Sequence, residues 1–172
     1  MTRLYLMRHG ETVDNAAQLM QGQTQGQLNE NGIRQAEQAG KELATYPFDA
    51  IISSDLKRSV DTARIVARHH GLPVVTTPLL RERDWGDFTG RFIPDLKGLP
   101  FPDNVEQLDQ LLNRARRFLH YIYKEYSGQT VLAVGHGIIN KAIQAVYHDC
   151  GMKDVPRMTN AEVRLLELND DY

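Results

Sequence analysis

Short apolar runs alternate with longer amphipathic stretches along the whole chain. Apolar runs of this length are typical of strands, whereas apolar residues recurring at positions i, i+3, i+4 and i+7 are typical of helices. Strands are predicted at residues 3–7, 50–53, 73–76, 130–134 and 162–168, and helices at 30–45, 56–69, 105–126 and 138–148. This alternation predicts an α/β fold, a three-layer sandwich with a mostly parallel central sheet. The strand at 162–168 is either parallel or antiparallel to the others.

Two segments have a less regular pattern. Glycine and proline recur through residues 84–104, which indicates a loop. Phe88, Phe92 and Phe101 within it either line a substrate pocket or hold the loop against the core. In the 30–45 helix, Ile33 and Ala36 are expected on the buried face. On the 105–126 helix, a basic face is expected to be solvated; it consists of Arg114, Arg116, Arg117 and Lys124.

Polar residues follow three of the predicted strands directly. The junctions read MRHGET, ISSDLKRS and AVGHGI. In an open α/β sheet, ligands bind beyond the carboxyl ends of the strands. If these three strands are parallel neighbours, the junctions bring together Arg8, His9, Arg58 and His136.

This combination of side chains is suited to phosphate chemistry. Two guanidinium groups in one pocket repel each other unless an anion lies between them, and their geometry matches phosphate oxygens. Arg58 falls at the start of a predicted helix, which adds backbone N–H donors. A neutral imidazole is a nucleophile toward phosphorus, and neighbouring arginines favour its unprotonated form. A turn through Gly10 would place a backbone carbonyl near one nitrogen of His9 and leave the other free to attack.

Four motifs resemble those of the histidine phosphatase superfamily, which includes the cofactor-dependent phosphoglycerate mutases. They are LMRHGET with Asn15 close behind, SSDLKRSVDTA at 53–63, LLRERDWGDFTG at 79–90 and VGHG at 134–137. They occur in the family's order and span nearly the whole chain. The resemblance therefore implies a phosphoglycerate mutase-like fold and phosphoryl transfer.

The resemblance also implies a role for each matching residue. His9 would become phosphohistidine, and Glu82 would protonate the leaving oxygen and then act as a base on the acceptor. The phosphoryl oxygens would be held by Arg8, Arg58 and His136, with Asn15 and the backbone of Gly137 nearby. Glu82 is flanked by two arginines, so its alternative role is to compensate their charge. No metal or organic cofactor is implied.

The acceptor of the phosphoryl group distinguishes a phosphatase, which transfers it to water, from a mutase, which transfers it to a bound phosphoglycerate. A mutase must exclude water from its phosphohistidine, and the mutase branch carries a much longer insertion where this chain has only residues 91–104. The short segment favours a phosphatase acting on a small phosphate ester. Arg83, which also occurs in the mutase motif, leaves open the alternative of a mutase that uses 2,3-bisphosphoglycerate. A non-catalytic module that binds phosphate or a phosphoprotein is the alternative of another class.

Length, composition and charge bear on the number of domains, the partners and the cellular location. The 172 residues fit one domain over 1–172, with 41% hydrophobic and 24% charged residues. A net charge of −2 gives no indication of a nucleic-acid partner. No apolar run approaches the ~18 residues that cross a membrane, and no signal peptide is evident. Cys150 is the only cysteine, so a cytoplasmic location is expected. The sequence does not determine the oligomeric state.

Overall fold

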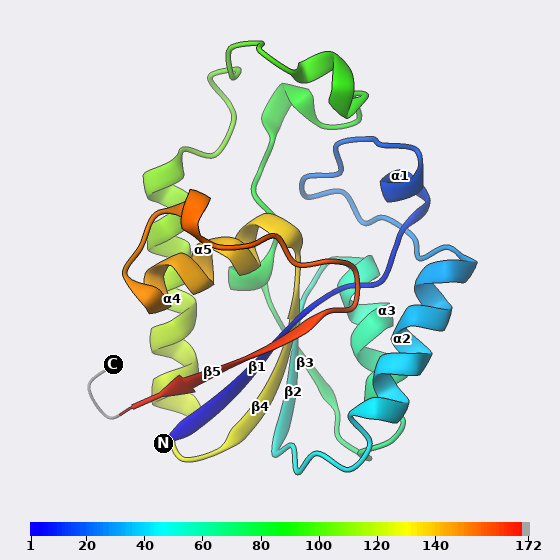
Figure 1. Cartoon of the computed structure of the whole chain (residues 1–172), viewed down its shortest axis with the longest axis vertical. Helices are drawn as coiled ribbons and strands as arrows, with labels where there is room; N and C mark the ends of the chain where they lie inside the picture. Colours follow the sequence, from blue (N-terminus) through cyan, green and yellow to red (C-terminus); the bar gives the residue numbers. More distant parts are fainter. Residues whose placement is uncertain (170–172) are drawn as a thin grey trace.

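The computed structural model describes residues 1–169, which form a five-stranded sheet covered by helices (Figure 1). The strand order is β3-β2-β4-β1-β5, in which β5 is antiparallel to β1 and the other neighbours are parallel. The strands are β1 (Thr2–Arg8), β2 (Ala50–Ser54), β3 (Val74–Thr77), β4 (Thr130–Gly135) and β5 (Val163–Leu168). The predicted α/β class and the mostly parallel sheet are confirmed.

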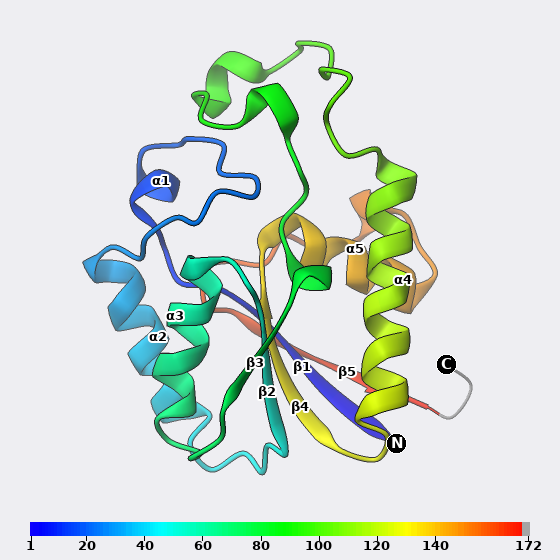
Figure 2. The ribbon, with the colours of Figure 1, turned by 180° about the vertical axis from the view of Figure 1, so that it is seen from behind.

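Helices cover both faces of this sheet, α4 and α5 on one side and α2 and α3 on the other (Figures 1 and 2). The α-helices are α1 (Val13–Ala16), α2 (Glu30–Glu42), α3 (Lys57–Ala67), α4 (Leu108–Glu125) and α5 (Gly137–His148). The 3₁₀ helices are η1 (Pro78–Leu80), η2 (Gly86–Phe88), η3 (Ile93–Leu96) and η4 (Met152–Asp154). In residues 1–169, no helix is both long and apolar enough to cross a membrane.

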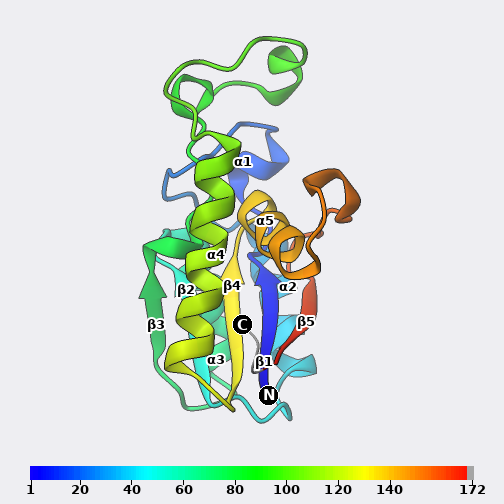
Figure 3. The same ribbon diagram turned by 90° about the vertical axis from the view of Figure 1, so that its left-hand side faces the viewer.

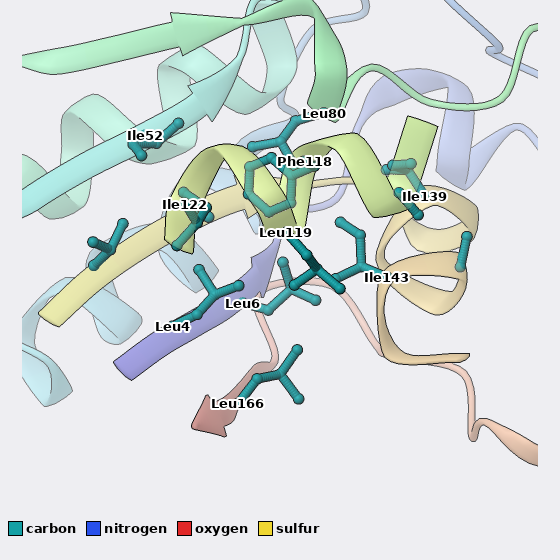
Figure 4. Packing of buried hydrophobic residues seen from close by; sticks show 14 of the residues in the cluster. Leu4, Leu6, Ile52, Leu80, Phe118, Leu119, Ile122, Ile139, Ile143 and Leu166 are labelled. Carbon is teal, nitrogen blue, oxygen red and sulfur yellow. The ribbon is translucent and has the colours of Figure 1, made fainter. Parts of the chain in front are cut away.

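The larger core layer lies between the sheet and α4 with α5 (Figure 4). Leu111, Ala115, Phe118 and Ile122 follow helical spacing on α4, and all four are fully buried. They pack against apolar side chains of the parallel strands, such as Leu4. Burial of a large apolar side chain contributes roughly 1.5–3 kcal/mol, so this face holds α4 firmly on the sheet.

Helix α2 departs from the predicted buried face only at Ile33. Ile33 is 40% exposed, whereas Gly32 and Ala36 are buried. The cause is a close approach between the start of α2 and the chain after β1. A Cβ atom on Gly32 would lie only 1.9 Å from the carbonyl oxygen of Glu11. Glycine at this position lets the helix start pack directly against the segment that follows His9.

The cap segment, residues 84–107, lies beyond the carboxyl ends of the strands (Figure 3). Residues 84–104 of this segment were predicted as a loop, and they contain the two short helices η2 and η3; residues 105–107 were predicted as helix, but α4 begins at Leu108. The backbone N–H of Met20 donates to Arg91 O (2.9 Å), which joins the cap segment to the chain near α1. Phe88 is buried, while Phe101 is 55% exposed and packs edge-on against Trp85. Phe88 therefore anchors the segment, and both phenylalanines line one cavity beneath it.

Candidate active site

The register of the sheet brings the two predicted histidines side by side. β1 pairs with β4 so that Arg8 lies opposite Gly135, and the His9 N–H donates to the Gly135 carbonyl (3.1 Å). The next residue on β4, His136, therefore lies beside His9, and their ring centroids are 5.0 Å apart. Arg58 arrives from the first turn of α3, just after β2 on the other side of β4. These four side chains are all buried.

The other predicted site residues meet at the same place. One cavity of about 280 Å³ is lined by six of the seven predicted residues: Arg8, His9, Asn15, Arg58, Glu82 and Gly137. The seventh, His136, contacts the ring of His9. The structure therefore brings together all seven residues, which come from distant parts of the chain.

His9 is oriented by the backbone of its own turn. Its Nδ1 donates to the carbonyl oxygen of Gly10 at 2.6 Å, as predicted, and Nε2 is therefore the nitrogen with a free lone pair. Burial and the nearby positive charge of Arg58 lower the pKa of His9 to about 3. The ring is therefore neutral at physiological pH, which is the form in which an imidazole nitrogen can attack.

Three buried side-chain nitrogens at this site have no hydrogen-bond partner among the described residues. They are Arg8 Nε, Arg58 Nε and His136 Nδ1. The remaining guanidinium nitrogens that bond do so with backbone carbonyls, including Met158 O for Arg8 (2.8 Å) and Gly22 O for Arg58 (2.7 Å). Carbonyl groups fix the orientation of the two cations without neutralising their charge. Buried donors of this kind require an acceptor, and an anion with several oxygens supplies it.

Two serines orient His136. Its Nε2 lies 2.9 Å from Ser54 Oγ and 3.1 Å from Ser59 Oγ. Ser54 Oγ already accepts from the N–H of Leu56, so its own proton is available to Nε2. This favours the tautomer with its proton on Nδ1, the atom without a partner. Burial, followed by the charge of Arg58, lowers the pKa of His136 well below its usual value, so the ring is a neutral donor.

Glu82 is held at the beginning of α5. Its carboxylate accepts from Ile138 N (3.1 Å) and Ile139 N (3.0 Å), and also from Arg83 N (2.9 Å). The flanking arginines turn away from it. Arg81 forms a bidentate pair with Asp55 at 2.7 Å, and Arg83 Nε donates to the carbonyl of Glu106. Neither arginine side chain therefore bonds the carboxylate of Glu82, although the charge of Glu82 opposes the lowering of the Arg83 pKa by burial.

Asn15 and Gly137 complete the lining of the cavity. The side-chain oxygen of Asn15 caps α1 by accepting from Thr12 N (3.1 Å), which leaves its Nδ2 group without an acceptor among residues 1–169. Gly137 is the first residue of α5, and none of the described residues accepts its N–H. Both groups add donors beside the two arginines. The described part of the chain contains no cluster of three or more side chains suited to a metal ion.

The sequence model of the histidine phosphatase superfamily (branch 1) matches residues 4–172. The chain belongs to this superfamily. It is 34% identical to a metal-independent phosphoserine phosphatase of Arabidopsis thaliana, over 98% of this chain and 77% of that protein. It is 36% identical to a probable phosphoglycerate mutase of Yersinia pestis, over 80% of this chain and 71% of the relative. The fold matches that of a mycobacterial glucosyl-3-phosphoglycerate phosphatase, with a TM-score of 0.88 at 29% identity over 96% and 92% of the two chains.

Together with this geometry, membership of the superfamily identifies the chain as a phosphomonoesterase of the histidine phosphatase type. The non-catalytic alternative also conflicts with the geometry, because a neutral histidine and a carboxylate line one cavity. Because one relative is named as a probable phosphoglycerate mutase, the acceptor of the phosphoryl group is either water or a second substrate.

In this histidine phosphatase, the prediction of a solvated basic face on α4 is wrong for Arg114. Its side chain is only 14% exposed and pairs with Glu106 at 2.8 Å. It also donates to the carbonyls of Leu79 (3.0 Å) and Glu82 (3.3 Å). Backbone carbonyls from a distant segment converge on it, which helical periodicity does not reveal. Arg114 thus fixes the backbone that carries Glu82.

Sequence reasoning also missed Ser54 and Ser59. Both lie within the junction ISSDLKRS, and the repeated serines of this junction were the available signal. It likewise missed Arg157, which lines the same cavity from the chain before β5. No motif marks Arg157, because its position depends on how the last loop folds back over β1.

Proposed function

We propose that this chain, as one domain over residues 1–172, hydrolyses small phosphate monoesters in two steps through a phosphohistidine at His9. The main support is the set of three buried N–H donors without partners around the His9 ring. Such preorganised donors bind the phosphoryl oxygens and stabilise the charge that they carry in the transition state.

In the first step, Nε2 of neutral His9 attacks phosphorus and the bond to the leaving oxygen breaks. Protonated Glu82 gives its proton to that oxygen, so the alcohol leaves neutral. In the second step, the Glu82 carboxylate takes a proton from water as the water oxygen attacks the phosphohistidine. The P–N bond breaks, inorganic phosphate leaves, and both residues return to their starting states. Arg8, Arg58 and His136 hold the phosphoryl oxygens throughout.

Access of water decides between hydrolysis and transfer to a second substrate. The cavity at His9 adjoins a second cavity of about 650 Å³ beneath the cap segment, and the two share lining residues such as Trp85 and Ile93. Ile93 is 44% exposed, so the cap segment leaves its own apolar side chains open to solvent. This openness supports water as the acceptor. The relative named as a probable phosphoglycerate mutase supports the second candidate, a mutase dependent on 2,3-bisphosphoglycerate.

Trapping of the intermediate tests this proposal. Rapid quenching with ³²P-labelled substrate should give label that is stable to base and labile to acid, as expected of a P–N bond. His9→Ala should abolish the label, whereas His120→Ala, at an exposed histidine of α4, should retain it. Label on the His9→Ala variant would contradict the assignment of the nucleophile.

Partitioning of the label separates the two enzyme candidates. With 3-phosphoglycerate present, we expect most of the label as free phosphate. Predominant transfer to phosphoglycerate would instead establish a mutase.

We place the reaction in the cytoplasm, on the basis of the single, exposed Cys150.

A further inference from the structure

Arg157 lies at the junction of the two adjoining cavities. It lines the small cavity at His9 and also the larger one beneath the cap segment. Its positive charge lowers the pKa of Arg8, second in effect only to burial. Arg157 is exposed, and its side chain forms no hydrogen bond or ion pair with any of residues 1–169. An unpaired cation therefore stands where a leaving group would exit from the phosphoryl site.

The backbone beneath this cation is held in place. Arg164 donates to the carbonyls of Pro156 (2.8 Å) and Arg157 (3.2 Å), and it is itself paired with Glu162 at 2.6 Å. On the other side, Arg8 donates to Met158 O at 2.8 Å. The loop is thus tied both to β5 and to the phosphate-binding arginine. A fixed backbone positions the Arg157 side chain at the junction at little entropic cost on binding.

The larger cavity indicates what else the leaving group contains. Trp85, Ile93, Leu96 and Phe101 form an apolar part of its lining. The charged side chains that line it are Arg8, Glu11, Lys97 and Arg157. Glu11 accepts from Asn29 Nδ2 at 2.8 Å and is therefore partly satisfied. Positive charge predominates, and it is combined with an apolar wall of a size that accommodates a ring or a short alkyl chain.

The transferred phosphoryl group does not account for Arg157. That group already has three buried donors, on Arg8, Arg58 and His136. Arg157 differs from these residues because its side chain is exposed and has no partner among residues 1–169, whereas theirs are buried around the His9 ring. Its position matches a different part of the substrate.

We propose that Arg157 determines specificity by binding a second anionic group, a carboxylate or a phosphate, on the leaving group of the substrate. The favoured class is then a phosphate monoester whose alcohol carries an acidic group on a partly apolar body. This inference rests on the proposed hydrolysis at His9. The preference among esters can be absent while hydrolysis at His9 still occurs, so the two proposals can be tested separately.

A matched pair of substrates isolates the second charge. The 4-carboxyphenyl and 4-carbamoylphenyl phosphates have nearly the same shape, but only the first carries an extra negative charge at neutral pH. The corresponding 3-substituted pair covers a second distance from phosphorus. The wild-type protein should have a higher kcat/KM for the carboxylate in at least one pair.

The Arg157→Gln variant should remove this preference. We expect kcat/KM for the carboxylate to fall about tenfold, mainly through KM, as is typical for loss of one charged hydrogen bond, while the carboxamide changes little. Arg157→Lys should restore part of the preference. Lys153→Gln, an exposed residue of η4 that lines neither cavity, controls for the change in net charge.

Three results would overturn the inference. If the wild type hydrolyses both esters of each pair equally well, Arg157 selects no second charge and the proposed hydrolysis stands. If Arg157→Gln slows both esters equally, Arg157 serves the transferred phosphoryl group instead. If the wild type hydrolyses none of the four esters and forms no phosphohistidine with them, the proposed function fails and this inference fails with it.

Discussion

Replacement of Glu82 by glutamine separates its chemical role from its structural one. The carboxylate accepts three backbone hydrogen bonds: Ile139 N and Arg83 N donate to Oε1, and Ile138 N donates to Oε2. A glutamine with its carbonyl at the Oε1 position keeps the first two. Its amide group then faces Ile138 N, where two donors meet. The structural cost is therefore about one hydrogen bond, roughly 0.5–1.5 kcal/mol.

Loss of the transferable proton has a larger effect than this structural cost. General acid catalysis contributes ~10²–10⁴-fold, which corresponds to about 3–5 kcal/mol of activation free energy. The two effects also differ in their dependence on substrate. The structural effect acts on every ester alike, whereas a proton is needed most by the poorest leaving groups. Alkyl phosphates should lose ~10²–10⁴-fold in kcat/KM, and 4-nitrophenyl phosphate much less.

The assay is kcat/KM over a series of alkyl and aryl phosphates for the wild type and Glu82→Gln, plotted against the pKa of the leaving alcohol. The slope should be steeper for the variant. Glu125→Gln, at the exposed end of α4, is the matched control and should reproduce the wild-type line. Parallel lines for Glu82→Gln and the wild type would refute the assignment of Glu82 as the general acid.

Three further outcomes are expected. Because the pKa of His9 is lowered to about 3, the unfolded chain binds more protons between pH 6.5 and 3, and stability is lost as the pH falls through this window. Urea titrations at several pH values give the unfolding free energy as a function of pH. In His9→Asn the slope of this free energy against pH should be smaller than in the wild type, by up to about 1.4 kcal/mol per pH unit. An unchanged slope would show that His9 takes up a proton in the folded protein. Gly10→Ala should lower the unfolding free energy by about 1–3 kcal/mol, since its Cβ would lie 2.5 Å from the carbonyl of Gly32, whereas Gly151→Ala should stay near wild type. Arg58→Met should weaken inhibition by inorganic phosphate about 10–100-fold, through loss of a charged hydrogen bond of ~1.5–3 kcal/mol, and an unaltered inhibition constant would exclude Arg58 from the phosphate site.

The site residues of the three strand junctions were predictable from the sequence because their placement follows from the sheet. Parallel neighbouring strands end at one edge, so residues directly after them meet. His9 and His136 needed only the register of β1 with β4 to become neighbours. The Gly10 carbonyl that orients His9 is adjacent in sequence, so the free nitrogen of the nucleophile was also predictable. Roles at these positions came from the resemblance to a family, and their chemistry remains a proposal.

Other features depended on contacts between distant segments. The antiparallel direction of β5 was left open by its sequence and is set by pairing with β1. Ile33 is exposed because Gly32, rather than Ile33, packs against Glu11 at the start of α2. In each case the side-chain pattern allows more than one arrangement, and packing against a remote backbone selects one of them.

The sequence alone determined the alternation of strands and helices, and it determined that arginine and histidine side chains follow the strand ends. Both features depend only on local periodicity and residue type. Only the tertiary structure decided the function of polar side chains whose partners are backbone carbonyls or hydroxyls far along the chain. Arg114 reads as a solvated helix residue and is instead turned inward, because carbonyls of residues 79–82 converge on it. Arg157 has no motif, yet the folding of its loop over β1 places it at the cavity that contains His9. The position of a charge relative to a cavity is set by the path of the whole chain, and no local pattern encodes that path.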